Sequence, residues 1–134
     1  AFSKALLSGE PITIYGDGSA SRDFLHVDDL IAGIVLTLEM DLEPATVLHL
    51  ATDRETSVLE LAQIMRSTAN KPEHPIDFQP SRPGEVHRNF ANFEQARAVL
   101  GFRPQVSLEE GLERTWHWFL QQGDRALQVK ATDS

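Results

Sequence analysis

The sequence has no cysteine, a single tyrosine and no long hydrophobic run. The absence of cysteine excludes disulfides, thiolate catalysis and cysteine metal sites, and it suits the reducing cytoplasm, where we expect the protein to work. The longest apolar run, residues 30–38, is too short to cross a bilayer, so we expect no membrane partner. The five histidines follow no metal-binding spacing, and we predict no metal site.

Basic residues are few: twelve Lys and Arg stand against twenty Asp and Glu, giving a net charge of −8. This balance excludes the basic surface that a nucleic-acid partner requires. Nine of the twelve bases are arginines. A guanidinium forms fixed, forked contacts with phosphate or carboxylate, so the arginines are the candidates for an anion site.

Phosphate-binding and nucleophile motifs are also missing. There is no G-x-G-x-x-G, no G-x-x-x-x-G-K-[ST] and no G-x-S-x-G. The glycines of "GDGS", residues 16–19, precede a predicted strand instead of a helix, which favours a plain turn over a phosphate cradle. "HVDD", residues 26–29, holds a histidine near two acids, and helix capping explains it better than a metal does. By themselves the residues indicate no catalytic group.

What is present predicts one α/β domain over residues 1–122, followed by a frayed tail at 123–134. Residues 1–11 are typical of the end of a helix closed by Gly9, so we expect the chain to be a piece of a longer protein. Residues 81–91 predict a loop or irregular strand. Apolar patterning predicts strands at 12–15, 23–27, 46–51 and 76–80, and helices at 28–40, 56–69, 92–102 and 107–123.

The predicted helices have recognisable N-terminal caps. Asp28 or Asp29 caps the first of these four, and Asn92 caps the third. Ser57 and Ser107 cap the second and the fourth. Each of these serines is followed three residues later by a glutamate, which predicts a capping box.

Two arginines stand out as anion ligands. Arg22 follows the glycine turn, and Arg82 lies in "PSRPGE", where two prolines restrict the backbone. The "RPGE" segment could hold a phosphate and a hydroxyl together. The alternative is that Arg22 forms an internal ion pair with an acid such as the adjacent Asp23. The residues alone leave these two interpretations open.

Three segments resemble one known family. They are "ITIYGDGSASRDFLHVDDL" at 12–30, "LHLATDRETSVLELAQIM" at 48–65 and "RPGEVHRNFANFEQARAVLGFRPQVSLEEGLERTWHWF" at 82–119. Together they are similar to the extended short-chain dehydrogenase/reductase family, the NAD-dependent nucleotide-sugar epimerases and dehydratases. The resemblance runs in the family's order over residues 2–120.

The resemblance implies a fold and a site. The chain would be the small α/β C-terminal substrate lobe of a Rossmann-type enzyme, and its partner a nucleotide-diphosphate sugar, with a UDP-sugar favoured. Arg22 and Arg82 match the family's diphosphate ligands, and Glu85 matches the acid that binds the ribose hydroxyls. Thr13 and Tyr15 match the strand residues that lie against the base.

The chain also departs from the family. The glycine-rich NAD fingerprint is absent, and so is the catalytic Tyr-x-x-x-Lys pair, because Ser19 stands four residues after Tyr15. We therefore expect NAD to bind the parent enzyme through a missing N-terminal Rossmann lobe. We expect no cofactor and no activity in this chain alone. The family further implies that the parent is a homodimer.

The reaction is less defined than the family. Residues 82–92 are most similar to 4-epimerases acting on UDP-sugars, such as UDP-glucose 4-epimerase. UDP-glucuronate decarboxylases and dTDP-glucose 4,6-dehydratases are the alternatives within the family. Outside enzymes, the chain could be a stand-alone nucleotide-sugar binding module. A third possibility is a fragment that self-associates through an apolar interface near Phe2, Leu6 and Phe24.

Overall fold

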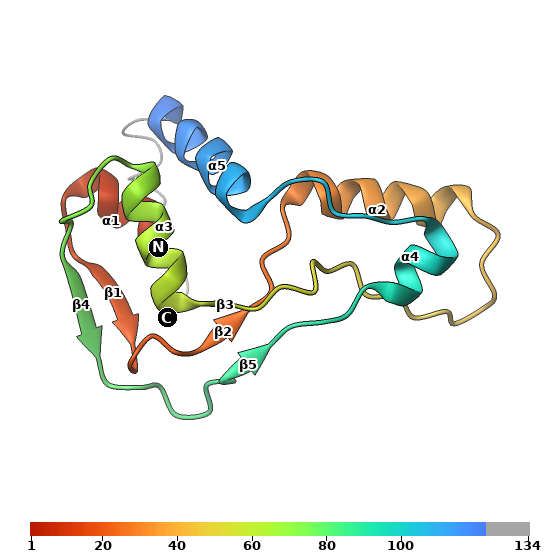
Figure 1. Cartoon of the computed structure of the whole chain (residues 1–134), viewed down its shortest axis with the longest axis horizontal. Coiled ribbons are helices and arrows are strands. Elements are labelled where there is room, and N and C mark those ends of the chain that lie inside the picture. Colours follow the sequence, from red (N-terminus) through yellow and green to blue (C-terminus); the bar gives the residue numbers. More distant parts are fainter. Residues whose placement is uncertain (123–134) are drawn as a thin grey trace.

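The computed structural model describes residues 1–122, which form five helices and five short strands (Figure 1). The predicted α/β class is confirmed, whereas the predicted tail at 123–134 lies outside the described residues. In chain order the elements are α1 (Phe2–Ser8), β1 (Ile12–Tyr15), β2 (Ser21–Arg22), α2 (Val27–Glu39), β3 (Thr56–Ser57), α3 (Val58–Thr68), β4 (Ile76–Gln79), β5 (Arg88–Asn89), α4 (Glu94–Leu100) and α5 (Leu108–Gln122).

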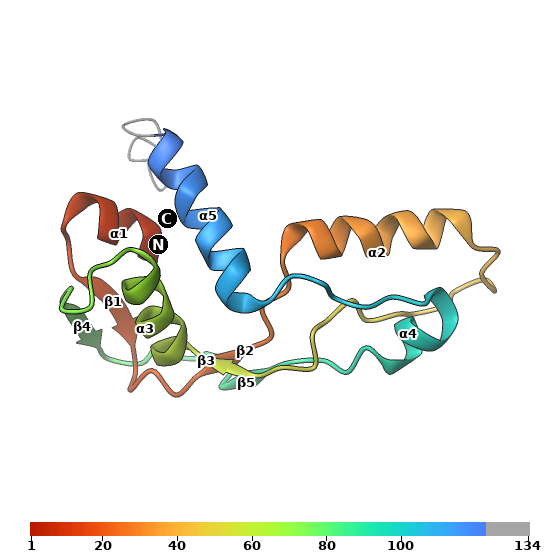
Figure 2. The same cartoon turned by 45° about the horizontal axis from the view of Figure 1, so that its top comes forward.

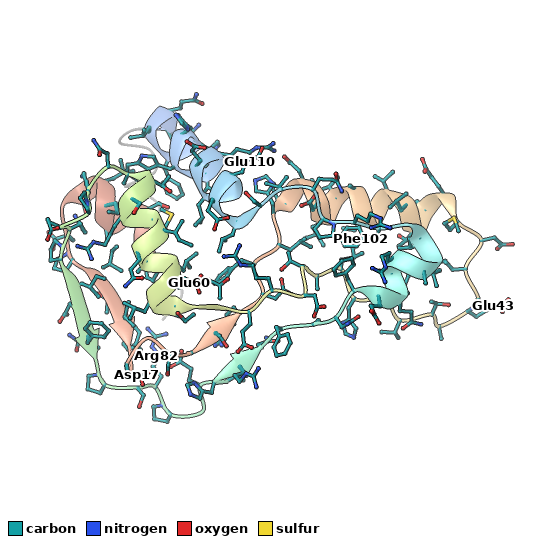
Figure 3. All side chains as sticks on the ribbon, in the orientation of Figure 1. Asp17, Glu43, Glu60, Arg82, Phe102 and Glu110 are labelled. Atoms are coloured by element: carbon teal, nitrogen blue, oxygen red, sulfur yellow. The ribbon has the colours of Figure 1, made fainter. Side chains whose placement is uncertain are left out.

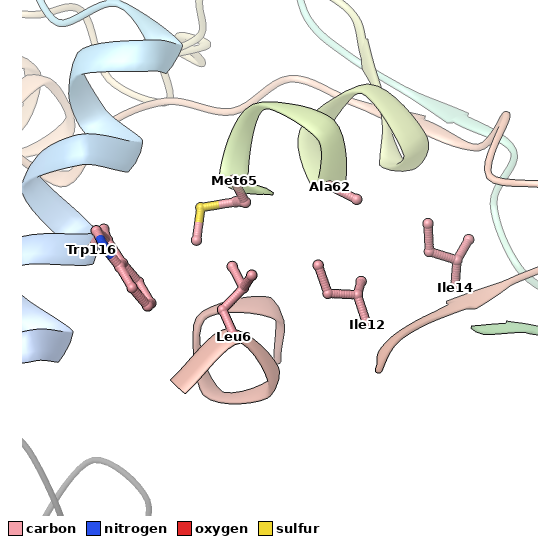
Figure 4. Packing of buried hydrophobic residues seen from close by; sticks show 6 residues of the cluster. All are labelled: Leu6, Ile12, Ile14, Ala62, Met65 and Trp116. Atoms are coloured by element: carbon pink, nitrogen blue, oxygen red, sulfur yellow. The ribbon is translucent and has the colours of Figure 1, made fainter. Parts of the chain in front are cut away.

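One hydrophobic core lies where α1, α3 and α5 pack beside β1. The alternation of side chains along β1 sends Ile12 and Ile14 inward and leaves Thr13 and Tyr15 on the open face. Trp116 of α5 closes the other end of this core (Figure 4). The buried members are Leu6, Ile12, Ile14, Ala62, Met65 and Trp116.

The strands form two small sheets. β1 pairs in parallel with β4, with Tyr15 opposite Gln79. β2 lies between β3, which is antiparallel to it, and β5, which is parallel. The two-residue strand β2 therefore joins segments that are far apart in the sequence, around Ser57 and around Arg88.

A second core forms at the opposite end of the elongated molecule, between α2 and α4 (Figures 1 and 2). Phe102 is almost completely buried there, and its ring meets that of Phe93 edge-on at 6.0 Å between centroids. Gly33 lets α2 come close, because a Cβ at this residue would lie 2.7 Å from a methyl of Leu50. Extended segments link this end to the first core.

Two of the predicted caps are confirmed. The hydroxyls of Ser57 and Ser107 accept from the N–H groups three residues later, at 3.0 and 3.1 Å. The predicted cap at Asn92 is wrong by one residue, because Phe93 is the N-cap of α4, although the Asn92 side chain accepts from the N–H of Glu94 at 2.6 Å. The predicted capping boxes are incomplete, because the glutamates of the two serine caps contact arginines instead: Glu60 lies near Arg54, and Glu110 accepts from Arg114.

The predicted aspartate cap of α2 is wrong. The ring of His26 accepts from the N–H of Asp28 at 3.2 Å, so the helix begins one residue earlier than predicted. Asp29 lies within the first turn and is buried. Its carboxylate accepts from the N–H groups of Gln105 and Val106, at 3.0 and 2.9 Å. It thus ties α2 to the segment before α5.

Two predicted strands are also absent from the described residues. The pairing that was predicted at 23–27 occurs earlier, at Ser21 and Arg22. Residues 46–51 are not a strand, although Leu48 and Leu50 still face the second core. Within residues 1–122, no backbone hydrogen bond joins 47–51 to another segment, so this stretch lacks the neighbour that would make it a strand.

Exposed apolar side chains gather on α2 instead of near the N-terminus. Leu6 is fully buried, so the interface predicted around Phe2, Leu6 and Phe24 is wrong at its centre. The α2 stripe, by contrast, has side chains between 40% and 79% exposed: Leu30, Ile31, Ile34, Val35 and Leu38. No helix within residues 1–122 is long and apolar enough to cross a membrane.

Candidate functional site

A hollow of about 260 Å³ lies between the turn after β1 and the loop after β4. The parallel pairing of the two strands brings these segments together, because Tyr15 lies opposite Gln79 and the N–H of Gly16 donates to the Gln79 carbonyl at 2.8 Å. The residues that line the hollow are Tyr15, Gly16, Asp17, Ala20, Ser81, Arg82, Gly84, Glu85 and His87.

Arg82 and Tyr15 are in direct contact at this hollow. The Arg82 guanidinium carbon lies 3.7 Å from the centroid of the Tyr15 ring, which is a close cation–π stack. The stack covers one face of the guanidinium and leaves its N–H edge free to meet an anion. Figure 3 places Arg82 beside Asp17, where the loop passes the turn. The stack restricts the Arg82 side chain, so the loop presents its positive charge at the hollow in a limited range of orientations.

Carboxylates complete the lining. Glu85 follows Arg82 in a tight turn, in which its N–H donates to the Arg82 carbonyl at 3.3 Å and Gly84 adopts a φ of +79°. Asp17 accepts from the backbone and the hydroxyl of Ser19, and these bonds lower the pKa of its carboxyl. A cation for phosphate and carboxylates for hydroxyls thus occur within one hollow.

The structure brings together three of the five predicted site residues. Tyr15, Arg82 and Glu85 line the hollow described above. Thr13 lies on the same open face of β1 as Tyr15 but does not line this hollow. Arg22 lines a neighbouring hollow of about 200 Å³ together with Asn89.

The linings of the two hollows come within two residues of each other in the sequence, since His87 lines the first and Asn89 of β5 lines the second. Arg22 forms no ion pair with the acids of residues 1–122, and its Nη1 donates to the Ser21 carbonyl at 2.6 Å. The Asp23 carboxylate is used elsewhere, accepting from the backbone and hydroxyl of Thr52. Internal pairing of Arg22 with Asp23 is therefore not observed.

Among the residues of the hollow that the sequence did not indicate, three have polar side chains: Asp17, Ser81 and His87. The interpretation of "GDGS" as a turn is correct, with Gly16 and Gly18 both at positive φ. It gave no reason to place Asp17 beside Arg82, because only the pairing of β1 with β4 does so. His26 caps α2 in place of the predicted aspartates, a role that its sequence position did not indicate.

The comparisons with known proteins agree with this architecture. Residues 1–115 match the family described as GDP-mannose 4,6 dehydratase. The chain belongs to this family. The predicted membership in the NAD-dependent extended short-chain dehydrogenase/reductases is thereby confirmed, since its relatives and structural neighbours are UDP-sugar epimerases and decarboxylases.

Three similar proteins show the range of named activities within the family. The chain is 37% identical to a UDP-glucose 4-epimerase of Mycolicibacterium smegmatis over 88% of its own length and 37% of that protein. It is 34% identical to UDP-glucuronic acid decarboxylase 1 of Danio rerio, over 84% of this chain and 26% of that one. A crystal structure of UDP-glucuronic acid 4-epimerase from Bacillus cereus, in complex with UDP-glucuronic acid and NAD, matches 90% of this chain and 38% of that chain, with 31% identity and a TM-score of 0.83.

The chain therefore spans between a quarter and two fifths of the length of these family members. The turn at Gly16 and Gly18 leads into β2 and not into the N-terminus of a helix, where backbone N–H groups would face a pyrophosphate. What residues 1–122 offer instead is an arginine- and carboxylate-lined hollow.

Proposed function

We propose that this chain is the nucleotide-sugar-binding lobe of an NAD-dependent epimerase acting on a UDP-sugar. The hollow that joins Tyr15, Arg82 and Glu85 is the observation that carries the proposal. Arg82 would hold the diphosphate, Glu85 the ribose hydroxyls and Tyr15 the base. Arg22, in the second hollow, would reach the diphosphate from the other side, and Thr13 would extend the face that meets the base.

Charge favours this assignment. A diphosphate brings negative charge to a protein of net charge −8, so it needs local cations to bind. Arg22 lies free of ion pairs with the acids of residues 1–122, and the stacked face of Arg82 leaves its donors available. Two charge-assisted contacts of this kind contribute on the order of 1.5–3 kcal/mol each.

NAD would supply the reversible removal of a hydride from the sugar, and it would bind outside this chain. The chain's own residues would grip the nucleotide, and this remote binding energy would hold the sugar near the cofactor. The proposal includes a further lobe that carries NAD and the catalytic pair, and it is supported by the relatives, of which this chain spans between a quarter and two fifths. Cytoplasmic location and a homodimeric parent belong to the same proposal.

The proposal predicts weaker nucleotide binding when either arginine is removed. Arg82→Ala and Arg22→Ala should each raise the Kd for UDP about 10- to 100-fold, which is the range that one lost charge-assisted contact corresponds to. Isothermal titration of the chain with UDP measures this. The affinity of the unmodified chain should also fall as salt is added, because the contacts are ionic and partly exposed.

Arg97→Ala is the matched control, because Arg97 is a similarly exposed arginine with a weak partner, Glu94 at 3.8 Å, and it lies on α4 in the other half of the molecule. It should leave the Kd unchanged. A chain that binds UDP equally well with and without Arg82 would contradict the assignment. Loss of folding in place of loss of affinity, seen as a lower Tm, would make the arginine structural.

A decarboxylase is the second candidate, favoured by the 34% identity to the Danio rerio enzyme. A protein that joins this chain to its catalytic lobe separates the two reactions. Incubated with UDP-glucuronic acid, a decarboxylase releases CO₂ and an epimerase changes only the configuration of the sugar. A stand-alone binding module would bind UDP and catalyse neither reaction.

A further inference from the structure

Glu55 lies at the junction of the three-stranded sheet and binds two of its segments at once. Its carboxylate accepts two hydrogen bonds from Arg88, from Nε at 2.7 Å and from Nη2 at 2.6 Å. The hydroxyl of Ser21 donates to the same carboxylate. Ser21 belongs to β2 and Arg88 to β5, so we call Glu55, Ser21 and Arg88 the clasp.

The clasp acts where the backbone pairing is minimal. β5 is two residues long, and its connection to β2 rests on few bonds, among them Ser21 N–H to the His87 carbonyl at 2.9 Å and Asp23 N–H to the Asn89 carbonyl at 3.0 Å. Both residues of β5 are exposed. Such a short exposed strand gains little from burial, so side-chain bonds hold much of its alignment.

The loop that carries Arg82 and Glu85 ends at this strand. Its N-terminal end is fixed where Gly16 bonds to Gln79 of β4, and its C-terminal end is fixed where Arg88 enters the clasp. All residues between, 81–87, are exposed and none is in a helix or strand. The placement of the loop over Tyr15 therefore depends on its two ends.

We propose that Glu55, through Arg88 and Ser21, is a positioning residue that fixes the 81–87 loop for the nucleotide, an inference that rests on the function proposed above. Glu55 touches neither Arg82 nor Glu85, and it lines neither of the two hollows. It acts by holding β5 on β2, so that the loop and Arg22 keep one arrangement. The guanidinium fork of Arg88 suits this task, because its two parallel bonds set direction as well as distance.

The charge state of the clasp is compatible with this role. The hydrogen bonds from Arg88, then that from Ser21, lower the pKa of the Glu55 carboxyl to about 2. The same pair raises the pKa of Arg88. Both partners are thus ionised at neutral pH, and the clasp stays closed under the conditions in which a nucleotide would bind.

Variants of the clasp test the proposal in two ways. Glu55→Ala and Arg88→Ala should each raise the Kd for UDP about 3- to 10-fold per folded molecule, and the double variant should be no worse than the poorer single one. Glu55→Gln, which keeps an acceptor for both partners, should recover part of the affinity. In the Arg82→Ala background, Glu55→Ala should raise the Kd by a smaller factor than in the unmodified chain, because part of the effect of the clasp passes through Arg82.

Hydrogen exchange of residues 81–88 without ligand provides the second readout. Glu55→Ala should speed exchange there, whereas Arg114→Ala should not. Arg114 of α5 also forms two exposed charged hydrogen bonds, one with Asp28 of α2 and one with Glu110 of α5. If the unmodified chain does not bind UDP, the proposed function fails, and the exchange of the loop still tests the clasp. The clasp is overturned if Glu55→Ala leaves both readouts unchanged, or if only Arg88→Ala loses affinity, which would make Arg88 a direct ligand.

Discussion

At the scale of single residues, a buried carboxylate decides which distant segments of the chain come together. Asp29 is 4% exposed, and its carboxylate satisfies two backbone N–H groups of residues 105 and 106. These groups belong to the segment that leads into α5. One carboxylate thus accepts the backbone hydrogen bonds that a neighbouring strand would otherwise accept, and it joins parts of the chain that are more than seventy residues apart.

We predict that Asp29→Ala lowers the free energy of unfolding by about 2–4 kcal/mol, because two partly buried backbone donors lose their acceptor. Asp28→Ala is the matched control. Its carboxylate is 60% exposed and pairs with Arg114, so its loss should cost less than about 1 kcal/mol. Urea denaturation of both variants measures the difference. Equal effects would contradict the role given to Asp29.

At the scale of elements, glycines set how closely the segments of the first core approach. Gly18 adopts a φ of +80° just before β2, and a Cβ there would lie 2.9 Å from the Cβ of Leu59 in α3. The Gly18 carbonyl also accepts from the Leu59 N–H at 3.0 Å. The start of α3 is thus held against the turn that borders the candidate site.

Gly18→Ala should therefore destabilise the chain more than Gly9→Ala does. Gly9 has a similar φ of +79°, but a Cβ there meets nothing within 4 Å. Both substitutions carry the strain of the left-handed conformation, about 1 kcal/mol. Only Gly18→Ala adds a steric clash, worth a further 1–3 kcal/mol or so. Thermal unfolding of the two variants measures the difference. Equal Tm values would contradict a steric role for the contact with Leu59.

At the scale of the whole molecule, α2 has apolar residues on more sides than the rest of residues 1–122 covers. Its inner side, at Gly33, contacts Leu50 and Phe102 of the second core, and its outer stripe is exposed. A helix that is apolar nearly all round is typical of one buried on both sides. Residues 47–51 run beside the same core as an extended segment without a backbone partner in residues 1–122.

These two features predict where the proposed further lobe would bind. In a protein that joins this chain to that lobe, amide exchange in residues 47–51 should slow at least about 100-fold relative to the chain alone, because strand pairing would protect these groups. Amides of β1, already paired with β4, serve as the control and should change little. Unchanged exchange in 47–51 would contradict the prediction. A stable dimer of the chain alone that protects α2 would make a second copy the occupant.

Local chemistry made much of the fold predictable. The caps at Ser57 and Ser107 follow from hydroxyl side chains beside helix-forming residues. The glycines at 9 and 101 end their helices in the left-handed conformation as expected, since no Cβ opposes it. Strand β1 and its inward isoleucines follow from a period of two. All of these depend on residues within a few positions of one another.

Local residue types could not show whether residues 23–27 and 46–51 form strands. A strand exists only when another segment satisfies its backbone groups, and its amino acids do not say whether such a segment is present. Residues 46–51 have the right composition and no partner within residues 1–122. Ser21 and Arg22 are not typical strand residues, but they have strands on both sides, β3 and β5, so the pairing occurs there.

The sequence by itself determined the helices and the caps at Ser57 and Ser107, because these depend on residue types at short spacings. The resemblance of three longer segments implied the family and, through it, Tyr15, Arg82 and Glu85 as candidates. Only the tertiary structure decided that these three line one hollow, that Arg22 lines the next, and that Asp17 and His87 join the first. It also decided the clasp at Glu55. Parallel pairing of distant strands creates these contacts, and no local pattern encodes which strands will pair.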